Sequence, residues 1–113
     1  MLSRPLTASI ATPLVLAILS EGESYGYEIL CRVRELSDDQ LQWKDGMLYP
    51  LLRRLEEQGL IESFWRDGEG ERQRRYYRLR AEGRSQLEEE GRQWQVALTT
   101  LSKVWKGVPC PTP

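Results

Sequence analysis

The chain has 113 residues, of which 40% are apolar and 29% charged, and its formal net charge is −1. This length favours one domain around a single core, and the composition is that of a soluble globular protein. Histidine is absent from the sequence, which removes the commonest general base and metal ligand and argues against most hydrolase and zinc-site interpretations.

The apolar run from Leu14 to Leu19 is too short to span a bilayer, and it has neither a cationic leader nor a small-residue cleavage site. We therefore expect a cytoplasmic protein without a membrane partner. Cys31 and Cys110 lie far apart and show no metal-ligand spacing. We expect no disulfide between them, with Cys31 packed in a helix and Cys110 in a proline-rich tail.

Residues 10–19 are nearly all apolar and predict a helix that is buried on most sides. Two starts are compatible with the sequence. Either the helix begins with Thr12 as N-cap and Pro13 at the first helical position, or a longer helix is kinked at Pro13.

A second helix is predicted from a Ser24 cap to Leu36, since apolar side chains recur at helical spacing. Its apolar stripe consists of Tyr25, Ile29, Val33 and Leu36. Residues 37–44 are polar and predict a loop, in which a short strand containing Leu41 and Trp43 is one alternative.

The third helix is predicted over Asp45–Gln58, with Asp45 as an N-cap and Gly59 as the left-handed residue that ends it. Four leucines follow the i, i+3, i+4, i+7 spacing of a core-facing stripe. They are Leu48, Leu51, Leu52 and Leu55. The opposite face carries Gly46, Met47, Pro50, Arg53, Arg54 and Glu57, with Tyr49 at the border.

Two strands, Leu60–Arg66 and Arg74–Leu79, follow directly and flank a turn at residues 67–70, which predicts a hairpin. Five arginines and no acid lie between positions 72 and 80, so this arm can meet phosphates even though the whole chain is nearly neutral. Glu69 and Glu71 argue against the hairpin tip itself entering a groove.

A last helix is predicted over residues 81–106. Large side chains recur along it at the alternating spacing of a heptad seam, which is narrower than the stripe needed to lie on the helix's own domain. The seam consists of Leu87, Gly91, Trp94, Leu98, Leu101 and Trp105. We expect a second copy of the chain to cover it and Leu14 to join the interface, giving a homodimer.

Gly91 lies one turn before Trp94 and costs about 1 kcal/mol relative to alanine in a helix interior. It either allows close backbone approach or leaves a gap beside the indole. Two such gaps facing each other across a dimer axis predict a slot for a small aromatic ligand at Trp94. The alternative is that Trp94 and Trp105 simply fill the interface.

The predicted fold is α+β, mostly α with a small β-ribbon: a winged helix-turn-helix with a long C-terminal dimerisation helix. The predicted parts are a DNA-binding domain at 1–80, whose first helix also enters the dimer interface, the dimerisation helix at 81–106, and a disordered tail at 107–113. The predicted partner is double-stranded operator DNA, bound through the third helix in the major groove and the hairpin on the phosphates. The predicted DNA contacts are Tyr25, Lys44, Gly46, Met47, Tyr49, Arg53, Arg54, Arg72, Arg74 and Arg75.

Simpler interpretations stay open for these residues. Arg53 is spaced to pair with Glu57 on a solvated face, and the hairpin arginines are equally suited to blunting an exposed sheet edge. A winged helix that binds an acidic protein, or one whose drug-binding pocket matters more than its operator, is the rival function. The carboxylates form no acid–base pair and no metal constellation, so we expect no enzyme, metal or cofactor.

The chain resembles the PadR family of bacterial transcriptional regulators over about residues 9–105. The stretches that carry the resemblance are residues 24–29 (SYGYEI), 46–56 (GMLYPLLRRLE), 59–61 (GLI), 75–79 (RYYRL) and 82–83 (EG). The resemblance implies a homodimeric winged-helix repressor of its own or a neighbouring operon, and several members are released by small aromatic compounds.

Carried over by position, the resemblance places Tyr25, Gly46, Met47, Tyr49, Arg53 and Arg54 in the DNA-reading part and Arg74 and Arg75 in the wing. The sequence departs from the family pattern in three places. Met47 stands where a hydroxyl residue is usual, and Arg80 replaces the usual threonine cap of the last helix. The C-terminal part is a single helix, which is the short form of the family.

Overall fold

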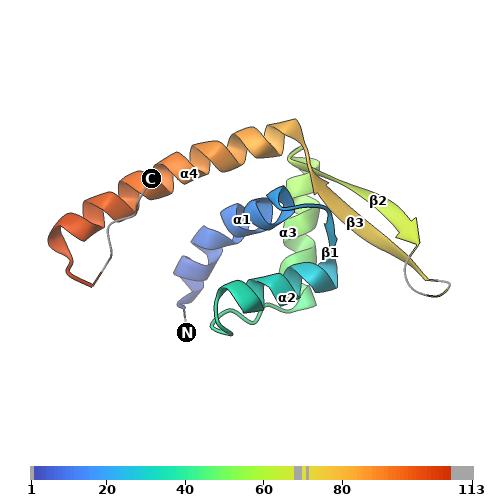
Figure 1. Cartoon of the computed structure of the whole chain (residues 1–113), viewed down its shortest axis with the longest axis horizontal. Coiled ribbons are helices and arrows are strands. Elements are labelled where there is room, and N and C mark those ends of the chain that lie inside the picture. The colour runs from blue at the N-terminus through green and yellow to red at the C-terminus, as the bar shows by residue number, and fades with distance from the viewer. Residues whose placement is uncertain (1, 68–69, 71, 108–113) are drawn as a thin grey trace.

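The computed structural model describes residues 2–67, 70 and 72–107. Within them lie four helices, α1 (Arg4–Ser20), α2 (Gly26–Leu36), α3 (Asp45–Glu57) and α4 (Ala81–Val104). Three strands, β1 (Ser24–Tyr25), β2 (Ile61–Asp67) and β3 (Gln73–Leu79), form an antiparallel sheet in the order β1-β3-β2. The hairpin of β2 and β3 projects from one end of the helical body, and α4 runs across the top (Figure 1). The predicted α+β winged-helix fold is confirmed.

Helix α1 begins well before the predicted cap at Thr12. Ser3 is its N-cap, and the Ser3 hydroxyl accepts a hydrogen bond of 3.4 Å from the Leu6 amide. Pro13 lies inside the helix, so the start at Thr12 is wrong and the alternative of a longer helix is confirmed, whereas the kink at Pro13 stays a prediction. Ala11 and Val15, on either side of the proline, are both buried on the same face of the helix. Their burial favours a helix that continues through Pro13.

Ser24 does not cap α2, because it belongs to β1. Tyr25 is the N-cap, and the Glu28 carboxylate accepts hydrogen bonds from the Tyr25 amide (3.4 Å) and the Ser24 hydroxyl (3.3 Å). Strand β1 pairs with β3, with Ser24 opposite Tyr77. The sequence did not predict this third strand, since two residues are too few to show a period.

The apolar stripe of α2 is only partly confirmed. Ile29 and Val33 are fully buried, but Leu36 is 49% exposed at the end of the helix. Cys31 is exposed and free, so its predicted packing is wrong, whereas Cys110 lies outside the described residues. Cys31 sits on the solvent side of a helix that buries only its other face.

The connection between α2 and α3 contains no strand, although both of its apolar side chains are buried. Leu41 is 7% exposed and Trp43 8% exposed, and both belong to the core cluster. The short strand considered for them is therefore wrong. The loop contributes these two side chains to the core without forming a strand.

Helix α3 lies within one residue of its prediction, and its four leucines are all buried. Lys44 is the N-cap, so the predicted Asp45 cap is wrong by one position. At the other end the Leu60 amide donates to the Leu55 carbonyl and the Gly59 amide to the Glu56 carbonyl, both at 3.0 Å. With Gly59 at a φ of +76°, this is a Schellman motif, as the glycine predicted.

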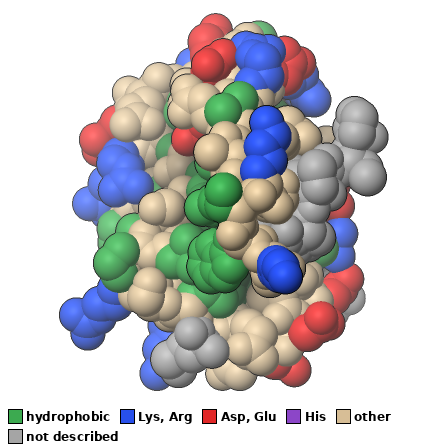
Figure 2. All heavy atoms as spheres, turned by 90° about the vertical axis from the view of Figure 1, so that its left-hand side faces the viewer, with side chains coloured by type: hydrophobic (Ala, Val, Ile, Leu, Met, Phe, Trp, Pro, Cys, Tyr) green, Lys and Arg blue, Asp and Glu red, His purple; other side chains and the backbone are tan. Residues whose placement is uncertain are grey.

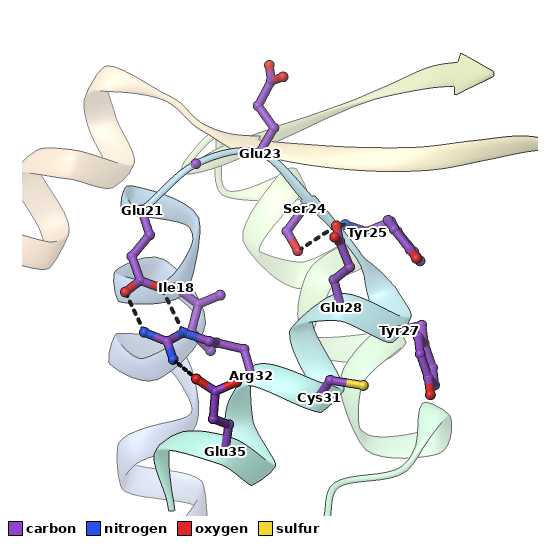
Figure 3. A pocket seen from close by; sticks show the side chains of 11 residues that line it. Ile18, Glu21, Glu23, Ser24, Tyr25, Tyr27, Glu28, Cys31, Arg32 and Glu35 are labelled. Atoms are coloured by element: carbon purple, nitrogen blue, oxygen red, sulfur yellow. Dashed lines mark hydrogen bonds and ion pairs between the residues drawn. The ribbon is translucent and has the colours of Figure 1, made fainter. Parts of the chain in front are cut away.

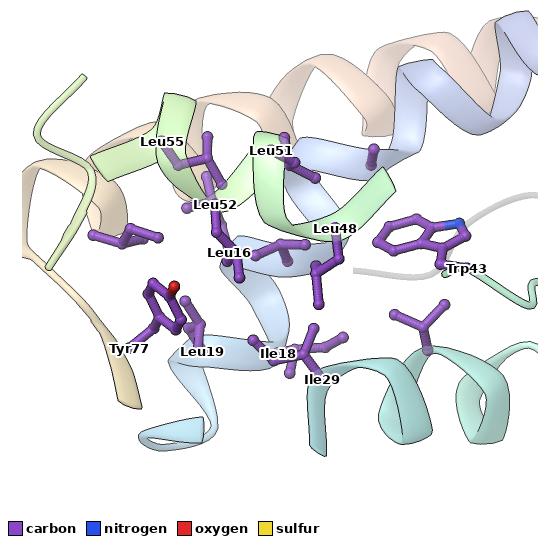
Figure 4. Packing of buried hydrophobic residues seen from close by; sticks show 14 of the residues in the cluster. Leu16, Ile18, Leu19, Ile29, Trp43, Leu48, Leu51, Leu52, Leu55 and Tyr77 are labelled. Carbon is purple, nitrogen blue, oxygen red and sulfur yellow. The ribbon is translucent and has the colours of Figure 1, made fainter. Parts of the chain in front are cut away.

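The core lies between α1, α2, α3 and the base of the sheet (Figure 4). Its fully buried large side chains are Leu16, Ile29, Leu48, Leu52, Leu55 and Ile61, with Val15 and Val33 beside them. Tyr77 closes the cluster from β3. Because the leucines of α3 are used here, the opposite face of that helix must be exposed.

Helix α4 lies within two residues of its prediction, and its first turn is fixed against the junction between α3 and β2. The Leu60 carbonyl accepts a 3.0 Å hydrogen bond from the Arg80 amide. Gly83 is buried there, and a Cβ at this position would overlap the Leu60 carbonyl oxygen and lie 2.7 Å from Leu79 Cδ1. Arg80 is the N-cap and makes no side-chain cap bond, as its departure from the family pattern implies.

The hairpin turn and the tail are described only in part. Residues 68 and 69 of the predicted turn, Glu71 directly after it, and residues 108–113 of the predicted tail lie outside the described residues. Among the helices that are described, none is both long and apolar enough to cross a membrane.

Replacement of Gly83 by alanine is expected to destabilise the protein by about 1–3 kcal/mol, because the new methyl group must displace the backbone of Leu60. Urea or thermal unfolding measures the change. Ser85→Ala, at an exposed position of the same turn, is the control and should leave stability nearly unchanged. Equal stability of the two variants would contradict the close packing of α4 on Leu60.

Candidate nucleic-acid interface

A cleft of about 470 Å³ separates the outward face of α3 from the β2–β3 ribbon. Residues from β1, α2, α3, β2 and β3 contribute to it, so it is formed only when the ribbon folds back beside the helix. Its lining consists of Tyr25, Gly26, Tyr49, Arg53, Glu56, Trp65, Arg74, Arg75 and Tyr77. Five of the predicted DNA contacts meet here: Tyr25, Tyr49, Arg53, Arg74 and Arg75.

The two arginines of α3 are both exposed but lie on different sides of the helix. Arg53 lines the cleft. Arg54 lines a separate depression with Thr12, Gln58 and Glu90, between α3 and α4. None of the ion pairs within the described residues involves either arginine, so the simple pairing of Arg53 with Glu57 is not observed.

Tyr49 lies across the start of α2. A Cβ at Gly26 would overlap the Tyr49 hydroxyl and lie 2.8 Å from its Cζ, so a larger residue there would require the phenol to shift. This is the structural use of the glycine in the 24–29 stretch, which sequence analysis quoted without a role. The Tyr49 side chain stays 46% exposed, with its hydroxyl close to the β1–α2 junction.

Arg74 is held by Tyr25 of β1. Its guanidinium donates a 3.0 Å hydrogen bond to the Tyr25 hydroxyl and lies 4.6 Å from the centre of the Tyr25 ring. Tyr25 in turn packs edge-on against Tyr76, with ring centres 5.3 Å apart. These contacts fix the direction of the guanidinium and leave its other donors without a carboxylate within the described residues.

Arg75 is tied to α3 through a small polar network. The Ser63 hydroxyl donates to Glu56 Oε2 at 2.5 Å, and Arg75 Nη2 donates to the Ser63 oxygen at 2.8 Å and to Glu56 Oε1 at 3.3 Å. Glu56 is thus the carboxylate of the cleft, and it joins helix and ribbon. Sequence analysis missed Glu56 and Ser63, because only the folded register brings them beside Arg75.

Two arginines of the ribbon, Arg66 and Arg78, are paired with carboxylates. Arg78 pairs with Glu62 at 2.7 Å and with Glu23 at 3.5 Å, and Arg66 also pairs with Glu23. The Glu62 hydrogen bond is the main reason that the pKa of Arg78 is raised, and Glu23 does the same for Arg66. The arm that looked free of acid in the sequence therefore receives carboxylates from β2 and from the turn before β1.

The remaining predicted contacts lie around the cleft. Lys44 and Gly46 are exposed at the N-terminus of α3, and Arg72 is exposed next to the undescribed turn. Met47 was predicted on the face of α3 opposite the core, but it is half-buried and packs against the core. It is not among the residues that line the cleft.

The seam of α4 is covered only at its beginning. Leu87 packs against the core together with Leu14 of α1, whereas Trp94 and Leu98 are half-buried. Leu101 is 41% exposed and Trp105 60% exposed, and a Cβ on Gly91 would meet nothing within 4 Å. Figure 2 views the end of the molecule at the left of Figure 1 and shows apolar side chains gathered near the middle of that end.

Trp94 borders a depression of about 430 Å³ between α4 and the start of α1, together with Ser9, Glu90, Gln93 and Ala97. Burial raises the pKa of the Glu90 carboxyl, and its Oε2 has no hydrogen-bond partner among the described residues. The Trp94 indole is half-buried and borders this depression, so it is neither fully packed nor fully exposed.

A fourth hollow, at the start of α2, is organised by ion pairs (Figure 3). Arg32 binds Glu21 at 2.8 Å and also Glu35 in the next turn of α2. The hydrogen bond from Arg32 lowers the pKa of Glu21. These contacts join α1 to α2 and account for the charges in this hollow. Within the described part of the chain, no group of three or more His, Cys, Asp or Glu side chains is placed to hold a metal.

Comparison with known proteins agrees with this geometry. Residues 15–89 match the transcriptional regulator PadR-like family. A transcriptional regulator from Clostridium thermocellum has a similar structure, with 31% identity and a TM-score of 0.80 over 89% of this chain and 98% of that one. A PadR-like transcriptional regulator from Bacillus cereus gives 28% identity and a TM-score of 0.79 over 88% of this chain and 95% of that one.

One further relative is known by sequence. An uncharacterised protein of Lysinibacillus sphaericus is 31% identical over 81 residues, which span 72% of this chain and 74% of that protein. A PadR family regulator from Eggerthella lenta has 38% identity and a TM-score of 0.74 over 88% of this chain and 85% of that one.

Replacing Glu56 with glutamine is expected to free Arg75 and to remove the negative charge from the cleft. Binding of non-target duplex DNA should therefore tighten several-fold, with a steeper salt dependence. Fluorescence anisotropy against salt concentration measures both. Glu57→Gln is the matched control, because it makes the same charge change at an exposed neighbour that does not line the cleft. An equal effect of the two variants would show that only net charge matters.

Proposed function

The chain belongs to the transcriptional regulator PadR-like family, and on this premise we propose that it is a homodimeric repressor that grips operator DNA with α3 and the β2–β3 wing. Regulators of this family bind DNA and are not enzymes. The repressor activity, the dimer and the individual contacts are our proposal. The observation that carries it is the cleft that joins Arg53 of α3 to Arg74 and Arg75 of the wing.

We assign each cation to a base edge or to a phosphate according to its position. Arg53 projects from the outward face of α3, which is the face that enters a major groove in a winged helix, and we assign it a base edge or a phosphate beside it. Arg72, Arg74 and Arg75 lie on the wing and are assigned to phosphates. Lys44 and the amide of Gly46 lie at the N-terminus of α3, where the helix dipole favours a phosphate.

The dimer is supported by the apolar side chains that α4 leaves uncovered. Beyond Leu87 the seam is only partly covered, since Trp94 and Leu98 are half-buried and Leu101 and Trp105 face solvent in the single chain. A second α4 packed along this seam would bury them. Two-fold pairing would then present two α3 helices to half-sites about one helical turn, roughly 34–36 Å, apart.

A small aromatic effector is the second part of the proposal. The half-buried Trp94 and the depression beside it would face their counterparts near the dimer axis and form an aromatic-lined slot. A ligand there would change DNA affinity only by binding one dimer arrangement better than another. Quenching of tryptophan fluorescence by flat aromatic compounds, lost in Trp94→Phe, tests this part.

Binding to a duplex from upstream of its own gene is expected to weaken with salt with a log–log slope of about −5, which corresponds to three neutralised phosphates per protomer. Arg53→Ala should reduce the preference for this duplex over a scrambled one by about 1–3 kcal/mol, because it removes a groove contact. Arg72→Ala should weaken binding to both duplexes equally.

Gel shift and in vitro transcription from the same promoter test these points. Binding that is insensitive to salt, or transcription that is unaffected by bound protein, would contradict the repressor. In that case an acidic protein becomes the favoured partner of the basic wing, which is the rival considered from the sequence.

The protein is expected to sediment as a dimer of the 13.2 kDa chain at micromolar concentration. Leu101→Glu should shift it to a monomer, because a charge is placed in the proposed apolar seam. Thr100→Glu, which adds the same charge at the adjacent exposed position, is the control and should leave the dimer intact. Sedimentation of the unaltered protein as a monomer would exclude the proposed interface.

A further inference from the structure

Trp65 lies on the face of the ribbon that packs against the core at its base, but at Trp65 this face is no longer covered by the core. Ile61, Ser63 and Trp65 alternate onto one face of β2, opposite Leu79, Tyr77 and Arg75 of β3. At the base of the ribbon this face is packed, since Ile61 is 1% and Tyr77 5% exposed. At Trp65 the same face has left the body of the protein, and the indole is 63% exposed.

On the other face of the ribbon, the aromatic residue Phe64 is covered by neighbouring side chains. Phe64 stacks on Tyr76 at 5.9 Å, and the guanidinium of Arg78 lies 4.6 Å and that of Arg66 5.3 Å from its ring. Among the described residues, the one ring or cation contact of Trp65 is Arg75, 6.0 Å from an indole ring centre, at the outer limit of such an interaction. The protein covers Phe64 and leaves Trp65 open.

The surroundings of Trp65 specify what kind of partner would cover it. It shares the cleft with Arg53, Arg74 and Arg75, whereas the Glu56 carboxylate is already engaged by Arg75 and Ser63. An anionic partner is therefore favoured. It must also offer an apolar surface beside its charge, because the indole contributes area rather than hydrogen bonds to the floor of the cleft.

The sugar-phosphate strand of a duplex has both properties. If α3 lies in a major groove and the wing rests on the neighbouring phosphates, one backbone strand passes between them and through this cleft. Its phosphates carry the charge and its deoxyribose rings are the apolar part. This step rests on the function proposed above.

We propose that Trp65 is a DNA-contacting residue whose indole packs against deoxyribose of the strand that passes between α3 and the wing. The arginines of the cleft bind the phosphates on either side of that sugar. The contact contains no charge and no base edge, so its contribution is independent of sequence and of salt. It differs in both respects from the contacts assigned to Arg53 and to the wing arginines.

The experiment compares the unaltered protein with Trp65→Ala, Trp65→Phe and Arg75→Ala on the upstream duplex and on a scrambled duplex of equal length, over a range of salt. Trp65→Ala is expected to weaken binding to both duplexes by roughly tenfold with an unchanged salt slope. Trp65→Phe should retain most of the affinity. Arg75→Ala should instead make the slope shallower by about 1 per protomer. Val96→Ala, at an exposed apolar residue on α4, is the control and should have no effect.

Two further measurements keep the outcome decisive. Circular dichroism must show that Trp65→Ala is folded, and Trp65→Phe must lose part of the fluorescence change seen when DNA binds. Normal DNA binding by a folded Trp65→Ala, or a changed salt slope, overturns the inference and leaves the proposed repressor standing. A changed sedimentation of Trp65→Ala also overturns it, because a second copy would then be the partner of the indole. Failure of the unaltered protein to bind DNA overturns both proposals.

Discussion

The burial of one face of α3 is the constraint on which the rest of the structure depends. Its leucines fill the space between α1, α2 and the sheet, and Leu48 and Leu52 are completely inaccessible to solvent. A helix that is held so firmly on one side has no freedom to rotate about its axis. The face of α3 on which Arg53 and Tyr49 lie is therefore set by the hydrophobic effect on the opposite face.

The backbone of one residue, Leu60, transmits this constraint to the wing and to α4. Leu60 donates its amide to the Schellman motif that ends α3, and its carbonyl accepts the Arg80 amide just before α4. Gly83 packs on the same carbonyl. The end of α3, the base of the ribbon and the start of the last helix thus meet at one residue. In the proposed dimer, a change of angle between the two α4 helices would reach α3 through this junction.

Most of the fold was predictable because long periodic segments carry their own signal. The leucines of α3, the glycine at its end and the β2–β3 hairpin all lie within two residues of their predicted positions. The start of α1 was missed because a proline early in an apolar run looks the same as a helix start. Strand β1 and the Glu56 network were missed for another reason. Both depend on pairing between segments that are distant in the sequence, which no local pattern encodes.

The distribution of carboxylates explains how a chain of net charge −1 presents a basic surface. Glu62 on β2 and Glu23 in the turn before β1 neutralise Arg66 and Arg78. In the cleft Glu56 is the carboxylate, and Arg53, Arg74 and Arg75 line the same cleft. The cleft therefore holds more cations than carboxylates. Because screening limits such charges to about 8–10 Å at moderate salt, this local surplus governs the approach of a phosphate strand more than the charge of the whole chain.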